Sequence, residues 1–234
     1  MLAPSTTNHR EHKPMTPKRF ALVEKKLALR QPDLTVLLEQ VHKSHNFSAI
    51  LRSCDAVGVF QANVVPPEGR SPVSNHTAQG AEKWVRVRRF ADMQAAHTGL
   101  KGEGFQLLAA HLDKDAIDFR QVDYTRPTAI VLGAERDGVR DDTLEKCDAT
   151  IYIPMHGMVQ SLNVSVAAAL ILFEAQRQRM ASGHYESRRL IGPLYDKTRF
   201  EWLHPTIARY CQRKGKPYPP LADDGELLEH PEKL

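Results

Sequence analysis

Residues 151–180 read IYIPMHGMVQSLNVSVAAALILFEAQRQRM, and this stretch decides the fold. It begins with a short apolar run typical of a β-strand, which ends at Pro154 because proline has no backbone N–H to donate. A loop containing methionine and glycine follows, and then a long segment with apolar residues at helical spacing. Either Ser161 or Asn163 can cap the amino end of that helix. The stretch therefore predicts a strand, a tight loop and a helix.

A strand, a loop and a helix start in this order often form a ligand site in α/β proteins. Backbone N–H and C=O groups are exposed there, and the helix dipole adds to the local field. The alternative is a plain connection that binds nothing. Two features favour the site: the methionine-containing loop can wrap an apolar ligand, and Gln160, Ser161 and Asn163 stand where a buried helix start would be apolar.

The composition is that of one globular domain with extensions. The chain has 234 residues, of which 41% are hydrophobic, and no apolar run reaches the length of a membrane span. Its amino end lacks the apolar region of a signal peptide, so we expect no membrane partner. Cys54, Cys147 and Cys211 form no CxxC pair, which indicates a reduced, cytoplasmic protein and argues against a cysteine-based metal site.

Charge is distributed unevenly along the chain. Residues 1–30 hold seven basic and two acidic side chains, whereas residues 223–234 hold five acidic and one basic. A basic arm favours a polyanionic partner, although a solvated leader would have the same composition. We expect three parts: a basic amino-terminal arm and helix at 1–32, a main domain at 33–180, and an extension at 181–234 with a basic segment and an acidic tail.

Strand-like and helix-like segments alternate through the main domain. The predicted strands are 34–41, 61–66, 84–90, 105–111 and 128–133, and the predicted helices are 17–30, 46–57 (capped by Asn46), 91–101 and 140–147. Residues 1–16 and 67–83 are expected to be irregular. The pattern predicts an α/β fold with a mainly parallel sheet and helices on both faces. Ligands of such sheets bind beyond the carboxyl ends of the strands, here near Ala110–His111, Leu132–Gly133 and Ile153–Pro154.

The common catalytic motifs are absent from the chain. It has no GxGxxG after a strand, no GxxxxGK[ST], no GxSxG and no HExxH. His42 and His45 have no third ligand in view, so a loop role is expected for both. The polar groups that remain at strand and helix ends can orient and polarise a substrate, but they do not suit metal hydrolysis or acyl transfer.

Three segments together resemble a known family. NFSAILR (46–52), LGAERDG (132–138) and IPMHGMVQSLNVSVAAA (153–169) are similar to the three motifs of the SpoU/TrmH methyltransferases, in the SPOUT superfamily. The resemblance covers roughly residues 30–180. RQPDLTVLLEQVHK (30–43) extends it towards the bacterial members that methylate the ribose 2′-hydroxyl of the D-loop guanosine at position 18 of tRNA.

The resemblance implies a SPOUT fold with a carboxyl-terminal trefoil knot around 151–180, an obligate homodimer, and S-adenosylmethionine bound in the knot. No metal is required, because the sulfonium leaving group becomes neutral. By analogy, six residues contact the methyl donor, largely through their backbone. They are Ala110, Leu132, Gly133, Ile153, Met158 and Leu162.

The same resemblance implies five catalytic residues: Arg52, Asn46, Glu135, Ser161 and Asn163. Arg52 would activate the 2′-hydroxyl, either as a base or by stabilising the developing oxyanion. A guanidinium keeps its proton in proteins, so the electrostatic role is the less demanding one. Asn46 would hold Arg52 or the ribose, and the other three would fix the loop and orient the substrate. The structural alternative is that both asparagines only cap helices and Glu135 only ties down a loop.

Several basic groups could contact RNA phosphates: the 17–30 helix, Lys43, the 198–214 segment, Arg177, Arg179, Arg188 and Arg189. In the 17–30 helix, Phe20, Val23 and Leu27 form the apolar stripe, and the basic residues, Arg30 included, are expected outside it. Two other functions remain open on the sequence. One is a ribosomal-RNA 2′-O-methyltransferase of the same family, and the other is a non-catalytic RNA-binding protein.

Overall fold

The computed structural model describes residues 15–67 and 83–229. Expectations that concern residues 1–14, 68–82 and 230–234 lie outside the described residues. The chain divides into two compact units. The larger is Ala28–Ile191, and the smaller joins the residues up to Leu27 with Gly192–Leu234. The arm and the extension, separate in sequence, thus contribute to one unit.

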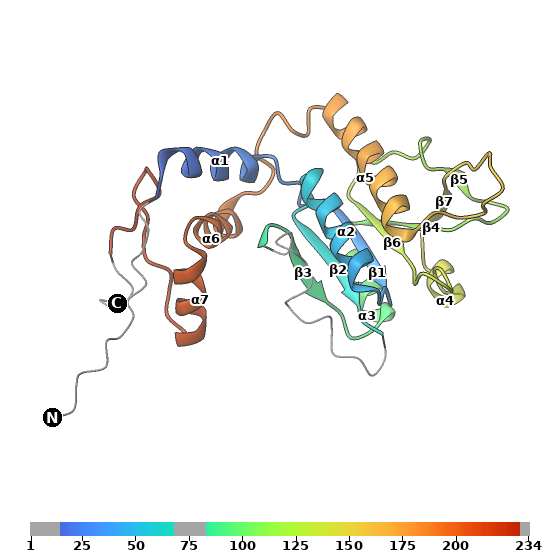
Figure 1. Cartoon of the computed structure of the whole chain (residues 1–234), viewed down its shortest axis with the longest axis horizontal. Coiled ribbons are helices and arrows are strands. Elements are labelled where there is room, and N and C mark those ends of the chain that lie inside the picture. Colours follow the sequence, from blue (N-terminus) through green and yellow to red (C-terminus); the bar gives the residue numbers. More distant parts are fainter. Residues whose placement is uncertain (1–14, 68–82, 230–234) are drawn as a thin grey trace. The chain divides into compact units, whose positions relative to one another are not determined.

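The larger unit is built on a seven-stranded sheet (Figure 1). Its order is β3-β2-β1-β6-β4-β7-β5, and every pairing is parallel. The strands are β1 (Leu34–Glu39), β2 (Gln61–Val65), β3 (Arg86–Arg89), β4 (Gln106–Ala110), β5 (Ile117–Asp118), β6 (Thr128–Leu132) and β7 (Ala149–Tyr152). The predicted parallel α/β sheet is confirmed.

Side chains alternate along the central strands and supply two cores. In β1, Val36 and Leu38 join the core under helices α2 (Ser44–Ala56) and α5 (Val164–Ala181), whereas Leu37 joins the core that contains α3 (Met93–Gly102). This alternation follows from the two-residue repeat of a strand, and it makes β1 apolar on both faces. The helices of this unit are α2 (Ser44–Ala56), α3 (Met93–Gly102), α4 (Asp141–Leu144) and α5 (Val164–Ala181). Figure 1 shows α2 and α5 side by side on one face of the sheet.

Most predicted elements occur with shorter bounds, and the two helix starts differ from each other. Asn163 is the N-cap of α5, where its side chain accepts a hydrogen bond from the Ser165 backbone N–H at 2.8 Å. The predicted cap at Asn46 is wrong. Helix α2 begins at Ser44, and Asn46 lies inside it, 1% exposed. Strand β5, only two residues long, was not expected, because a run that short has no readable repeat.

Two arginines expected on the surface are buried. Arg179 is 0% exposed, so the expectation that it contacts RNA is wrong. Arg30 is 4% exposed; it follows the end of α1 and donates to the Val59 carbonyl and to Asp55. Both guanidiniums are used inside the protein, where buried charges need partners.

The smaller unit is helical. It contains α1 (Pro17–Ala28), α6 (Gly192–Leu203) and α7 (Pro205–Lys214). The predicted apolar stripe of α1 is confirmed by buried Val23 and Leu27, and the predicted interruption at Pro205 separates α6 from α7. Glu24 of α1 accepts hydrogen bonds from Tyr195 and Arg199 of α6.

In the described ranges 15–67 and 83–229, no helix is both long enough and apolar enough to cross a membrane.

Candidate active site

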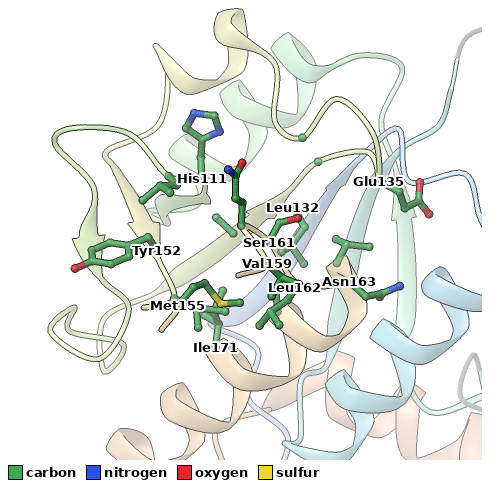
Figure 2. Close-up of a pocket in the computed structure, with 18 of the residues that line it drawn as sticks. His111, Leu132, Glu135, Tyr152, Met155, Val159, Ser161, Leu162, Asn163 and Ile171 are labelled. Atoms are coloured by element: carbon green, nitrogen blue, oxygen red, sulfur yellow. The ribbon is translucent and has the colours of Figure 1, made fainter. Parts of the chain in front are cut away.

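A cavity of about 1050 Å³ opens at the carboxyl ends of β4, β6 and β7. Ala110 and Leu132 are the last residues of β4 and β6. Gly133 comes directly after β6, and Ile153 comes directly after β7. Met158 and Leu162, in the loop before α5, complete the set of predicted donor contacts, and all six line this cavity. Figure 2 shows Leu132, Ser161 and Leu162 near its centre, with Glu135 and Asn163 on one side and Tyr152 on the other.

The loop that closes the cavity has exposed backbone. Residues 153–163 form neither helix nor strand, so their N–H and C=O groups are not engaged in a ladder. Met158 is 100% exposed, whereas Leu162 is partly buried. Apolar side chains next to free backbone donors and acceptors suit a ligand with an apolar body and a few polar groups. An adenosine derivative such as S-adenosylmethionine fits that description.

Gly133 sits where the backbone of β6 meets the following loop. A Cβ placed there would lie 1.9 Å from both the carbonyl carbon and the oxygen of Gly138. Gly138 donates its own N–H to the Ala134 carbonyl at 2.9 Å, which closes the loop over Gly133. The absence of a side chain at Gly133 is therefore what lets this loop pack against the end of β6.

We expect Gly133→Ala to open the loop and weaken ligand binding in the cavity. The added methyl meets backbone, which cannot rotate away, so the free energy of unfolding should fall by about 1–3 kcal/mol or more. Gly102→Ala is the matched control, because nothing lies within 4 Å of its Cβ position and Gly102 does not line the cavity. Thermal unfolding and calorimetric titration with S-adenosylmethionine measure both effects. Equal behaviour of the two variants would contradict the packing explanation.

Asn46 joins the helix α2 to two segments of the cavity. Its Nδ2 donates to Glu135 Oε1 at 2.8 Å, and its Oδ1 accepts from Asn163 Nδ2 at 3.1 Å. The backbone N–H of Lys43 also donates to Glu135 Oε1, at 3.2 Å. Three of the five predicted catalytic residues therefore form one hydrogen-bonded chain, Glu135–Asn46–Asn163.

Glu135 is held as a carboxylate. Burial alone would raise the pKa of Glu135, but the hydrogen bonds from Asn46 and from the Lys43 backbone, with the charge of His42, outweigh it. The pKa of Glu135 therefore lies below its ordinary value. A carboxylate fixed in this way orients the Asn46 amide, since the amide nitrogen is the end that must donate.

The other two predicted catalytic residues lie apart from this chain. Arg52 is on the exposed side of α2, does not line the cavity, and makes no hydrogen bond or ion pair within the described residues. Of the two partners expected for Asn46, Arg52 is not hydrogen-bonded to it in the described structure, where the Asn46 amide is bonded to Glu135 and Asn163. The contact between Asn46 and the ribose stays a prediction. Ser161 is exposed at the cavity, and its side chain has no partner among the described residues.

Several residues that line the cavity were not predicted. They are Lys43, Leu112, Ala134, Tyr152, Ala167 and Ile171, among others. Most lie within a few residues of a predicted strand end, so their position was readable, but which side of the chain faces the cavity was not. Within the described segments, no group of three or more His, Cys, Asp or Glu side chains is arranged to hold a metal ion.

Comparisons with known proteins agree with this geometry. The model of the SpoU rRNA Methylase family matches residues 33–173, and the model described as SpoU, rRNA methylase, C-terminal matches residues 177–230. The chain is 48% identical to the tRNA (guanosine(18)-2′-O)-methyltransferase of Escherichia coli K12, over 91% of this chain and 94% of that protein. It is 55% identical to the protein of the same name from Thermus thermophilus, over 80% and 97%.

Solved structures give the same result. The A. aeolicus TrmH/SpoU tRNA modifying enzyme is 41% identical, with a TM-score of 0.74 over 81% of this chain and 97% of that chain. The SpoU methyltransferase AviRb from Streptomyces viridochromogenes, solved with the cofactor AdoMet, is 28% identical, with a TM-score of 0.58 over 67% and 64%. The knot implied by the resemblance stays a prediction. The matched motifs, the parallel sheet and these relatives agree: the chain belongs to the SpoU methylase family.

Proposed function

We propose that the protein transfers a methyl group from S-adenosylmethionine to the ribose 2′-hydroxyl of the D-loop guanosine at position 18 of tRNA. One observation supports this most strongly. The similarity to the Escherichia coli enzyme of that name extends over 91% of this chain and 94% of that enzyme. The aligned region therefore includes the residues that line the cavity and most of the described residues before and after them in the sequence.

The cavity would hold the methyl donor chiefly through backbone groups. Leu132, Gly133, Ile153 and Leu162 line the cavity and would offer these groups, and Ala110 and Ile171, which also line it, would add apolar contact. When bound, S-adenosylmethionine supplies an electrophilic methyl group on a positively charged sulfur. The residues of the chain must then place the ribose oxygen in line with that methyl at near-attack distance.

Arg52 would act on the ribose oxygen. The oxygen forms the new bond to carbon as the carbon–sulfur bond breaks, the electron pair stays on sulfur, and the hydroxyl proton leaves. Negative charge grows on the oxygen during this step, and a guanidinium beside it stabilises that charge without giving up its own proton. A phosphate of the RNA bound near Arg52 could accept the proton.

The chain Glu135–Asn46–Asn163 would keep the loop before α5 in place during the reaction. Asn163 caps α5 and donates to Asn46, so the loop end and helix α2 move together. Ser161, exposed on the same loop, is placed to hydrogen-bond the substrate. This positioning is expected to affect the rate of methyl transfer more than the affinity for the substrates.

RNA contact would fall on exposed basic residues. Lys18, Lys25 and Lys26 of α1 are exposed, and α7 carries Arg213 and Lys214 in its last turn. Binding through phosphates releases counterions, so affinity for tRNA should fall steeply as salt rises.

The test uses purified protein, labelled S-adenosylmethionine and unmodified tRNA transcripts. One transcript keeps the D-loop guanosine and the other has adenosine in its place. Label in the first transcript only supports the proposal. Label in ribosomal RNA but in neither tRNA would show that the substrate is ribosomal RNA. Binding of S-adenosylmethionine without methyl transfer to any RNA would contradict the proposal and favour a non-catalytic RNA-binding protein.

We also infer that the protein acts as a homodimer, in the cytoplasm with its tRNA substrate. Helix α5 carries three apolar side chains on its exposed side: Val166 (46% exposed), Leu170 (43%) and Phe173 (50%). Their spacing of four and three residues places them in one row. A second copy of the same row is a self-complementary partner for it, as a two-fold dimer requires. All three cysteines are free thiols, as suits a reducing compartment.

Phe173→Asp is expected to dissociate the dimer. A two-fold interface would contain the residue twice, so two buried aromatic contacts are replaced by two unpaired carboxylates. The dimer dissociation constant should rise by about 100-fold or more. Sedimentation equilibrium measures it, and Ile191→Asp, at a 68% exposed side chain outside α5, is the matched control. A wild-type protein that stays monomeric at micromolar concentration would exclude this interface.

A further inference from the structure

His42 lies between the end of β1 and the carboxylate of Glu135. Its Nδ1 is 2.9 Å from the carbonyl oxygen of Gln40, and its Nε2 is 3.5 Å from Glu135 Oε2. Gln40 has a φ of 52°, a left-handed conformation that is uncommon for a residue other than glycine. This turn presents its carbonyl to the imidazole two residues later.

The Gln40 contact determines which ring nitrogen carries hydrogen. A carbonyl oxygen only accepts, so His42 Nδ1 must be the donor. In the neutral ring Nε2 is then an unprotonated acceptor, and it would face a carboxylate oxygen, which is also an acceptor. Only the imidazolium form, with hydrogen on both nitrogens, can make the Nε2 contact favourable.

The second oxygen of Glu135 needs such a donor. Oε1 accepts from Asn46 and from the Lys43 backbone, whereas Oε2 is buried and has no hydrogen bond within the described structure. The Glu135 side chain is only 7% exposed, so solvent gives little compensation. A buried carboxylate oxygen without a donor is costly, and the nearest candidate is His42 Nε2, at ion-pair distance.

We propose that His42 is a positioning residue for methyl transfer, and that its imidazolium form holds the second carboxylate oxygen of Glu135. Glu135 in turn orients Asn46, which holds Asn163 at the start of α5. The inference rests on the proposed function for its effect on rate, but the contact itself does not depend on it. His42 does not line the cavity, so it acts through Glu135 and not on the substrate.

The charged groups around His42 come from three elements. Glu135 faces it from the loop after β6. Lys43 and His45 follow it in the chain, Lys43 before α2 and His45 in its first turn. Glu39, at the end of β1, is engaged elsewhere: its carboxylate accepts from the Thr143 hydroxyl at 2.7 Å and from the Arg140 N–H at 3.0 Å. Glu135 is therefore the acidic partner of the ring.

The experiment compares wild-type enzyme with His42→Leu and His42→Gln. Leucine cannot donate to Glu135, whereas glutamine can donate at every pH. We expect His42→Leu to lower kcat about tenfold with the KM for tRNA nearly unchanged, and His42→Gln to keep most of kcat. The ratio of wild-type to His42→Gln kcat should fall as the pH is raised, because only the imidazolium form of His42 donates through Nε2. Steps common to both enzymes cancel in that ratio.

His97→Leu is the matched control. His97 is on α3 under the opposite face of the sheet, and its replacement should leave kcat unchanged. Equal losses in His42→Leu and His42→Gln with a flat pH ratio would show a purely structural role and overturn the inference.

A second measurement does not use activity. Unfolding free energies of His42→Leu, Glu135→Gln and the double variant form a double-mutant cycle. The two substitutions should be coupled at an acidic pH, where the imidazolium form is present, and additive at an alkaline pH, where it is absent. Additivity at both pH values would refute the contact even in a protein that transfers no methyl group, and an inactive wild type with coupling intact would refute only the proposed function.

Discussion

Replacing Arg52 with alanine is expected to lower methyl transfer to tRNA by about 100- to 1000-fold, the effect of removing one group that stabilises a developing oxyanion. Binding of S-adenosylmethionine should change by no more than about twofold. Single-turnover transfer to tRNA and calorimetric titration with the methyl donor measure the two quantities separately.

The separation follows from where Arg52 lies. It is exposed on α2 and does not line the cavity, so its removal takes nothing from the wall that would hold the donor. It has no partner among the described residues, so no internal hydrogen bond is lost either. Phe47, Ile50 and Leu51 of the same helix are buried and keep α2 in place. The expected loss is therefore one of rate and not of folding.

Two variants sharpen this prediction. Arg52→Lys keeps the charge but not the planar fork of donors, so transfer should recover only in part. Arg88→Ala is the matched control. Arg88 lies on β3, at one edge of the sheet, and pairs with exposed Glu103. Loss of donor binding in Arg52→Ala, or transfer at the wild-type rate, would remove Arg52 from the proposed mechanism.

The fold and the cavity could be predicted from the sequence because both depend on local patterns. The apolar runs of β1 and β6 are buried on both faces, which only a covered parallel sheet provides. Strand ends are readable from where those runs stop, and the carboxyl ends of parallel strands meet at one edge. Ala110, Leu132 and Ile153 were placed correctly at the cavity for that reason.

The side-chain partnerships could not be predicted, because they join distant parts of the chain. Asn46 and Glu135 are 89 residues apart, and Arg179 and Asp33 are 146 apart. Polarity alone predicts that Asn46 caps a helix and that Arg179 lies on the surface. Each is the usual role of that residue type. Only the packing of α2 and α5 on the sheet shows that both side chains are turned inward.

Arg179→Ala is expected to have the largest effect on stability. The Arg179 guanidinium is 0% exposed and makes five hydrogen bonds. It donates to the carbonyls of Tyr124, Asp33 and Arg126, to Gln31 Oε1 and to the Asp33 carboxylate at 2.7 Å. It thereby ties the carboxyl-terminal part of α5 to the segments that lead into β1 and β6.

Removing one partner of a buried ion pair costs about 3–5 kcal/mol, because the other partner and its acceptors are left unpaired. A loss of this size could exceed half the stability of an ordinary domain. Chemical denaturation measures it. Arg177→Ala is the matched control, since Arg177 is 66% exposed and pairs with Glu174 one turn away on the helix surface, where a change of no more than about 0.5 kcal/mol is expected.

The pH dependence of stability should change with the same substitution. Burial alone would raise the pKa of Asp33, but Arg179 and Arg189 outweigh it, so the pKa lies below its ordinary value. A carboxyl with a depressed pKa stabilises the folded state above its unfolded pKa of about 3.9, and this stabilisation is lost as pH falls through the folded pKa. In Arg179→Ala only Arg189 still opposes the effect of burial, so the pKa of Asp33 is less depressed. The loss of stability on acidification below about pH 4 should therefore be smaller in this variant than in the wild type. Denaturation of Arg179→Ala with the same acid dependence as the wild type, or a cost no larger than that of Arg177→Ala, would contradict the role of Arg179 as the buried tie between α5 and the sheet.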